Sequence, residues 1–158
     1  MVQVEVVGVR IEFPSNQPVL ILREIDSPRF LPLWIGMPEA SAISMALDGV
    51  AVSRPMTHDL LLNVITDFSE KLVSVEVTEL QDGVFYAVLQ FSTHDAVSAR
   101  PSDAVALAIR ADVPIYVSDD VMATAGQFVS EQEQESDTDT ELEQFREFLD
   151  QIKPEDFS

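Results

Sequence analysis

Residues 98–110 read SARPSDAVALAIR, and this stretch contains the pattern that decides the fold. Because a residue that precedes proline is biased away from helix, Pro101 is expected to open a helix rather than continue one. Ser102 is then the predicted N-terminal cap, and Asp103 is the predicted first-turn acid. The helix behind them is apolar on nearly every side, which predicts that several other elements cover it.

The same arrangement occurs earlier in the chain, where residues 38–47 read PEASAISMAL. Alternating apolar residues predict strands at 2–12, 19–25 and 29–36 before this helix, and at 72–80, 84–92 and 96–99 before the other. A helix at 57–70 connects the two units, and residues 113–117 read as a buried strand. The sequence therefore predicts an α+β fold, with duplicated strand–strand–helix units forming a mixed sheet on which the helices pack. Two ordinary α+β units could also have this pattern by chance.

The composition predicts one acidic domain followed by a tail. The chain has 158 residues and a formal net charge of −19. Residues 1–130 hold 17 acids and 7 bases, a net of −10, and residues 131–158 hold 11 acids and 2 bases, a net of −9. We predict a domain over residues 1–125, then a flexible acidic linker and a short amphipathic helix within residues 126–158. The apolar face of that helix comprises Leu142, Phe145, Phe148, Leu149 and Ile152.

The charge and the residue usage also narrow the class of protein. Acidic surfaces repel nucleic acid at low salt. At molar salt the electrostatic screening length falls to about 3 Å, and this repulsion mostly disappears. A surface rich in acids and poor in lysine therefore favours a halophilic source, and the alternative is an ordinary acidic cytosolic protein. The chain has no cysteine and no apolar run long enough to cross a bilayer. Its first residues read as a strand rather than a signal peptide, so we expect a cytoplasmic protein without a membrane partner.

A second Arg-Pro pair occurs in residues 53–65, SRPMTHDLLLNVI. In a structural interpretation, Thr57 caps the following helix and Asp59 interacts with the helix dipole. In a functional interpretation, His58 and Asp59 bind a metal ion or move a proton, and Arg54 binds a phosphate. The residue types and their spacing leave both interpretations open.

Carboxylates provide the remaining candidates for chemistry. Arg100 needs an acidic partner if it is buried, and Asp59, Glu39 and Asp103 are the candidates. If a pseudo-twofold axis relates the two units, Glu39 and Asp103 occupy equivalent places and could share a divalent cation. The chain has no glycine-rich phosphate loop, nucleophile elbow or paired-histidine motif, so we expect no nucleotide or redox cofactor. The aromatic residues Trp34, Phe85 and Tyr86 lie in apolar strands and are expected in the core.

Several blocks of the sequence together resemble the bifunctional nuclease domain family. These blocks are LPLWIGMPEASAISMALDGV, SRPMTHDLL, GVFYAVLQF and ARPSDAVALAIRADVPIYV, and the resemblance covers about residues 2–122. The resemblance implies an α+β fold in an oligomer, in a family named for members with both RNase and DNase activity. Its polar signature positions are Glu39, Arg54, Thr57, His58, Asp59, Arg100, Ser102 and Asp103.

Two hypotheses follow from the residues and the resemblance. In the first, the chain is a metal-assisted phosphodiesterase of RNA or DNA. Glu39, Asp59 and Asp103 hold Mg²⁺ or Mn²⁺, and His58 assists proton transfer. Arg54 and Arg100, with Thr57 and Ser102 beside them, bind the substrate. In the second, the same residues form a structural ion-pair network in a non-catalytic, oligomeric binding module. Both versions predict a homo-oligomer, with a dimer as the first expectation. Both also predict that Arg54 and Arg100 converge on one polar cluster, within a subunit or across an oligomer interface, whose carboxylates are Glu39, Asp59 and Asp103.

Overall fold

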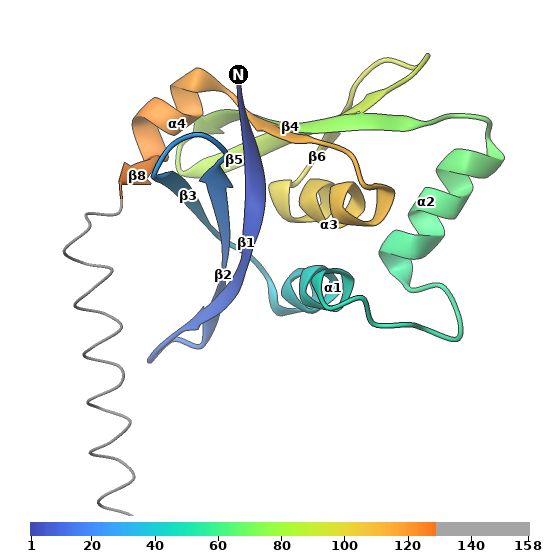
Figure 1. Cartoon of the computed structure of the whole chain (residues 1–158), viewed down its shortest axis with the longest axis horizontal. Coiled ribbons are helices and arrows are strands. Elements are labelled where there is room, and N and C mark those ends of the chain that lie inside the picture. Colours follow the sequence, from blue (N-terminus) through green and yellow to red (C-terminus); the bar gives the residue numbers. More distant parts are fainter. Residues whose placement is uncertain (129–158) are drawn as a thin grey trace, which may run out of the picture. The chain divides into compact units, whose positions relative to one another are not determined.

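A computed structural model describes residues 1–128 of the chain (Figure 1). Residues Met1–Gln127 form one compact body. The first unit of the repeat contains β1 (Val2–Glu12), β2 (Gln17–Glu24), β3 (Arg29–Trp34) and α1 (Met37–Leu47). After α2 (Thr57–Asp67), the second contains β4 (Leu72–Gln81), β5 (Val84–Phe91), β6 (Val97–Ala99) and α3 (Pro101–Ala111). The described chain ends with β7 (Ile115–Val117), α4 (Asp119–Ala125) and β8 (Gln127–Phe128).

The order of the strands confirms the predicted mixed sheet of repeated units. The order is β6-β5-β4-β7-β1-β2-β3-β8, so the three strands of each unit lie on either side of β7. The central strand β7 is parallel to β4 and antiparallel to β1, whereas the pairs within each unit are antiparallel. Both β1 and β4 also contain a register shift, after Val6 and after Val77. The duplication read from the sequence is therefore present in the topology.

The helices cover the sheet in the positions that the repeat requires. In each unit the helix packs on that unit's own hairpin, α1 on β1 and β2 and α3 on β4 and β5, and the two helices also pack against each other. The central helix α3 buries Ala104, Val105, Ala106, Leu107 and Ala108, as its apolar sequence predicts. Helix α4 contacts both β3 and β4. Because three strands separate β3 from β4 in the sheet order, the sheet must curl to bring them to the same helix.

The starts of two helices differ from the sequence expectation. Arg100, not Ser102, occupies the N-cap of α3, and Ser102 is a buried residue of its first turn. Met56, not Thr57, occupies the N-cap of α2. The physical reason for α3 is Pro101, which holds Arg100 in an extended conformation with φ −73° and ψ 144° and itself takes the first helical position. A proline is thus a stronger start signal in this chain than the hydroxyl that follows it.

The end of the described chain and two aromatic residues also differ from the sequence expectation. The sequence does not predict helix α4 or strand β8, because residues 118–128 have no clear hydrophobic period. Trp34 is not in the core, since 52% of its surface is exposed, and Tyr86 is also exposed. The predicted linker and amphipathic helix after residue 128 lie outside the described residues. Among residues 1–128, the helices are all too short or too polar to cross a membrane.

Candidate active site

Arg100 joins the first turns of α1 and α3. Its Nη2 donates a hydrogen bond to Oε1 of Glu39 at 2.8 Å, and its Nε donates to Oδ2 of Asp103, also at 2.8 Å. Glu39 and Asp103 are each the third residue of their helix. The predicted equivalence of these two carboxylates is therefore correct, and packing α1 against α3 brings both within reach of one guanidinium group.

The residue before α1 allows this arrangement. Gly36 is the N-cap of α1, and a methyl group added to it would overlap Oε2 of Glu39. The carboxylate of Glu39 can therefore fold back over the start of its own helix while its other oxygen accepts from Arg100. Since the neighbour is the flexible end of a side chain, a larger residue at 36 would displace the carboxylate rather than the backbone.

His58 extends this row of polar side chains. It lies in the first turn of α2, and its Nε2 is 2.9 Å from Oδ1 of Asp103. An ionised carboxylate only accepts hydrogen bonds, so Nε2 carries the proton and Nδ1 is the acceptor nitrogen of the neutral ring. The His58 side chain is 13% exposed and that of Asp103 is 29% exposed, whereas Arg100 is 66% exposed. Exposure therefore rises from the nearly buried imidazole of His58 to the open guanidinium of Arg100, and it falls again at Glu39, which completes the row His58–Asp103–Arg100–Glu39. We call these four residues the polar row.

The electrostatics of the polar row keep Asp103 ionised. Burial works to raise the pKa of Asp103, but hydrogen bonds from Arg100 and His58 outweigh it, so the pKa is lowered. The same contacts with Asp103 and Glu39 raise the pKa of Arg100. Asp103 can therefore fix the orientation and tautomer of His58 as an anion, and it is not a proton donor at neutral pH.

The polar row borders an open cleft of about 790 Å³ whose other walls are mainly apolar. Elements from both units and the connector form these walls. The apolar residues include Met45 from α1, Leu61 and Ile65 from α2, Leu89 and Phe91 from β5, and Val97 from β6. Thr57 also lines the cleft. The sequence did not reveal this apolar wall, because its residues read only as ordinary strand and helix positions.

Asp59 belongs to a different cluster, although it adjoins His58 in the sequence. Its Oδ1 accepts from Nε of Arg110 at 2.9 Å, and its Oδ2 accepts from the backbone nitrogen of Met56 at 3.0 Å. Arg110 also donates to the carbonyl oxygens of Ala106 and Ala42, each at 3.0 Å. Asp59 thus connects the start of α2 to α3 and α1 through Arg110. Sequence reasoning missed Arg110, although a lone cation at the end of an apolar helix was a usable signal.

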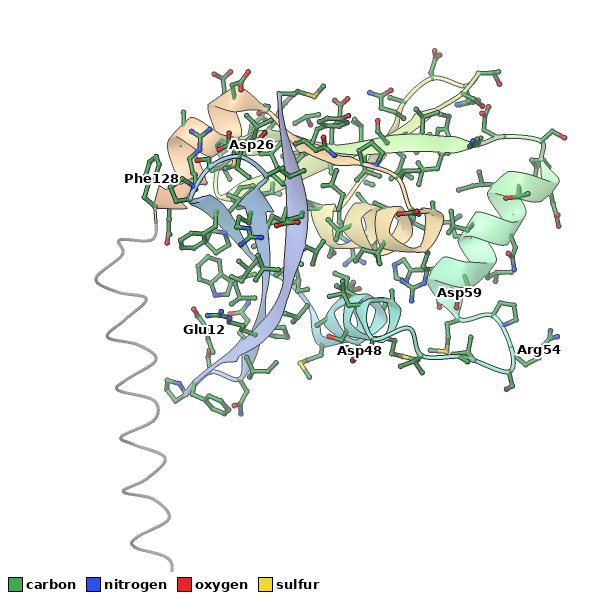
Figure 2. All side chains as sticks on the ribbon, viewed as in Figure 1. Glu12, Asp26, Asp48, Arg54, Asp59 and Phe128 are labelled. Carbon is green, nitrogen blue, oxygen red and sulfur yellow. The ribbon has the colours of Figure 1, made fainter. Side chains whose placement is uncertain are left out.

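Arg54 does not join the polar row. It is exposed in the loop between α1 and α2, and Figure 2 shows it at the outer side of that loop, away from the helices. Within residues 1–128 it makes no ion pair, in contrast to Arg100 and Arg110. Within one subunit, the predicted convergence is therefore correct for Arg100, Glu39 and Asp103 but does not extend to Arg54 or Asp59. The two Arg-Pro turns look alike locally, but within residues 1–128 only the arginine of the second turn bonds to another helix.

The predicted metal site is not assembled by these side chains. Mg²⁺ and Mn²⁺ prefer oxygen ligands, which Glu39, Asp59 and Asp103 would supply. Arg100 occupies an oxygen of Glu39 and one of Asp103, while Arg110 occupies an oxygen of Asp59. Across the part of the chain that the structure describes, no three acidic or histidine side chains are grouped to hold an ion. The three carboxylates named from the sequence therefore do not fit a shared cation.

Comparison with known proteins agrees with the sequence blocks. The model of the bifunctional nuclease domain matches residues 20–130, a range that includes the whole polar row. The chain is 48% identical over 161 aligned positions to the uncharacterized protein Rv1829 of Mycobacterium tuberculosis strain H37Rv, and equally to MT1877 of strain CDC 1551. These alignments cover 99% of this chain and 98% of each relative. The chain therefore belongs to the bifunctional nuclease domain family.

Proposed function

We propose that this protein is a nuclease that cleaves phosphodiester bonds of RNA, DNA or both in the cleft beside the polar row. The observation that supports the proposal best is the contact between His58 and Asp103, next to an exposed guanidinium at the mouth of an open cleft. Membership in the bifunctional nuclease domain family agrees with this chemistry. The proposal assigns the reaction to side chains that the structure brings together.

Arg100 is the proposed phosphate-binding residue. A guanidinium group has five N–H donors, and the bonds to Glu39 and Asp103 use one donor on Nε and one on Nη2. The remaining donors can bind the oxygens of a phosphodiester and stabilise the charge that develops on them. Its two carboxylate partners hold the guanidinium in place, so little orientation entropy is lost when the substrate binds.

His58 is the proposed general base and acid. The neutral ring takes a proton at Nδ1 from the attacking hydroxyl, either a water molecule or a ribose 2′-hydroxyl, while that oxygen forms its bond to phosphorus. The P–O bond to the leaving group then breaks, and the imidazolium returns the proton to the departing oxygen. Asp103 accepts from Nε2 throughout and stabilises the charged ring. Such a group contributes about 100-fold to 10,000-fold to the rate of a reaction.

A second proposal remains, in which the protein is a non-catalytic oligomeric module and the polar row is structural. The observation that favours it is that Arg100 already pairs with both Glu39 and Asp103, and Arg110 already pairs with Asp59. If the polar row is only structural, replacing His58 should leave any measured cleavage rate unchanged. A catalytic row should lose activity and keep its fold.

We further propose that the protein is a homo-oligomer, with a dimer as the first expectation. Helix α2 buries none of its own residues; Leu60 and Val64 are exposed on it, and Phe68 is exposed at its C-cap. Sedimentation of wild type and of Phe68→Glu tests this, because a charge on a shared apolar interface should shift the protein toward monomer. Wild type that sediments as a monomer at micromolar concentration would contradict the proposal.

The test of the nuclease proposal compares His58→Asn with His94→Asn. His94 is exposed and lies outside the cleft, so it is the matched control. Single-stranded RNA and DNA are incubated in dilute and in molar KCl, with EDTA or with Mn²⁺, and the thermal midpoint is recorded for each variant. We expect His58→Asn to lose about 100-fold or more of the cleavage rate with an unchanged midpoint.

The outcomes separate the alternatives. If wild type does not cleave under any of these conditions, or if His58→Asn cleaves as fast as wild type, the catalytic assignment is wrong. If EDTA abolishes cleavage and Mn²⁺ restores it, a metal ion supplies part of the chemistry, and the carboxylates of the polar row must rearrange to hold it. Cleavage that persists in EDTA supports the proposed roles of His58 and Arg100.

A further inference from the structure

Arg100 borders a second hollow in addition to the cleft. This hollow has a volume of about 450 Å³ and lies where the end of β3 meets the β4–β5 turn and the start of α3. Trp34, Phe85, Gly36 and Ser102 line it together with Arg100. We call it the Trp34 hollow. Arg100 therefore lines two cavities, one that His58 also lines and one that Trp34 also lines.

Trp34 is an unusual residue to leave exposed. It is the only tryptophan of the chain and the last residue of β3, and half of its surface is open. Its Nε1 donates a hydrogen bond to Oε2 of Glu12 at 3.2 Å, so the polar edge of the ring has a partner. An indole held by its edge, with much of its apolar surface uncovered, is suited to stack against another flat apolar group.

We propose that the Trp34 hollow binds the base of the nucleotide next to the phosphate that Arg100 holds, while the neighbouring nucleotide occupies the cleft. The part of this proposal that concerns the phosphate rests on the proposed function. A base that stacks on an aromatic side chain beside an arginine is the usual means by which proteins bind single-stranded nucleic acid without reading its sequence. Arg100 lines both hollows, as a residue that holds the phosphate between two nucleotides would.

The acidic surface of the protein is a further reason to expect binding through base stacking rather than through many phosphate contacts. Residues 1–128 hold 17 acids and 7 bases, and Arg23, Arg29, Arg100 and Arg110 already pair with carboxylates. An extended basic track along a polyanion is therefore not available on the described surface to supply affinity. Stacking depends little on ionic strength, so a base-binding hollow would retain substrate at the high salt that screens the acidic surface.

The first experiment uses the fluorescence of Trp34 in the wild-type protein. A phosphorothioate deoxydinucleotide, its abasic analogue with one base missing, and inorganic phosphate are titrated separately in molar KCl. We expect the dinucleotide to quench the emission in a saturable way, and we expect phosphate to leave it unchanged. The abasic analogue should bind about tenfold or more weakly, because one stacked base is lost.

The second experiment measures the kinetics of Trp34→Leu and Trp34→Phe on a short single-stranded oligonucleotide. Trp34→Leu should raise KM about tenfold with little effect on kcat, and Trp34→Phe should restore most of the loss because it keeps an aromatic ring. Tyr86→Leu is the matched control, since Tyr86 is an exposed strand aromatic that lines neither hollow. It should behave as wild type.

The two experiments distinguish a wrong base site from a wrong nuclease assignment. If wild type cleaves the substrate, but the dinucleotide does not quench Trp34 and Trp34→Leu has an unchanged KM, the base site is wrong and the nuclease proposal is unaffected. Base-dependent quenching without cleavage supports the hollow and overturns the nuclease. If the emission of free protein changes with protein concentration, and Trp34→Leu alters sedimentation, the hollow is a contact between copies and the inference is wrong.

Discussion

Arg100 is an exposed side chain that links two helices. It binds carboxylates from two helices and still presents most of its surface to solvent. Exposed ion pairs contribute little to stability, and we expect Arg100→Ala to lower the free energy of unfolding by only about 1 kcal/mol. If Arg100 binds the scissile phosphate, the same change should lower the cleavage rate about 100-fold.

The measurement pairs urea unfolding with the nuclease assay. Arg100→Lys is the control, because it keeps the charge but loses the planar fork that binds two carboxylates and that we propose binds the phosphate. We expect it to recover stability more fully than activity. A loss of several kcal/mol in Arg100→Ala would instead show that the polar row is chiefly structural.

Glu70, between α2 and β4, carries the clearest prediction about pH. The carboxylate accepts hydrogen bonds from Ser92, from the hydroxyl and backbone of Thr93, and from the backbone of Lys71. These bonds, the one from Ser92 foremost, lower the pKa of Glu70 from an ordinary value of 4.5 to about 2. Because the pKa is lower in the folded state, its contribution to stability is complete above pH 4.5 and is lost as pH falls toward 2.

Carboxyl ¹³C NMR measures this titration directly. The signal of Glu70 should remain that of the ionised form well below its ordinary pKa of 4.5 in the wild-type protein. Ser92→Ala should raise the pKa, since it removes the largest single contribution. A midpoint near 4.5 in wild type would show that the contacts with Ser92 and Thr93 do not persist in solution.

At the scale of elements, Arg110 holds three helices together. It lies at the end of α3 and bonds to Asp59 in α2 and to the carbonyl of Ala42 in α1, with only 11% of its side chain exposed. Arg110→Ala would leave the partly buried carboxylate of Asp59 without its cation and would remove a donor from the carbonyl oxygens of Ala42 and Ala106. We expect it to lower the free energy of unfolding by about 3 kcal/mol.

Urea unfolding of Arg110→Ala beside Arg54→Ala tests this assignment. Arg54 has no ionic partner within residues 1–128, so its removal should change the free energy of unfolding by less than about 0.5 kcal/mol. Similar effects of the two substitutions would contradict the role of Arg110. Asp59→Asn should resemble a mild form of Arg110→Ala.

At the scale of the whole molecule, residues 1–130 should fold without the rest of the chain. The buried apolar residues of the described part all lie between Val4 and Met122. Removal of residues 131–158 should therefore leave cooperative thermal unfolding intact. Loss of a cooperative transition would place the domain boundary further along the chain.

The net charge predicts how salt affects the stability of the protein. A compact chain with a net charge of −19 repels itself, and molar KCl screens that repulsion. The thermal midpoint at neutral pH should rise from dilute buffer to molar KCl. Near the sequence pI of about 4.1 the net charge vanishes, so the same addition should have a much smaller effect. A midpoint that stays flat or falls at neutral pH would contradict adaptation to high salt.

The sequence alone determined most of the elements and their repetition, because these depend on neighbouring residues. Pro38 and Pro101 mark the helix starts, alternation marks the strands, and Asp82-Gly83 marks the β4–β5 turn. The equivalence of Glu39 and Asp103 also followed from the repeated pattern. These features are local, since a proline restricts its own φ and the residue before it whatever lies elsewhere in the fold.

Only the tertiary structure decided which of these residues meet. Two Arg-Pro turns look alike in sequence, yet Arg100 bonds to Glu39 of α1, whereas Arg54 lies at the outer side of the loop between α1 and α2. Trp34 has the alternation of a core strand, but alternation defines two faces and does not say which face another element covers. Contacts between residues far apart in sequence depend on how the whole chain curls, and for that reason neither the contact of His58 with Asp103 nor that of Asp59 with Arg110 could be read from local pattern.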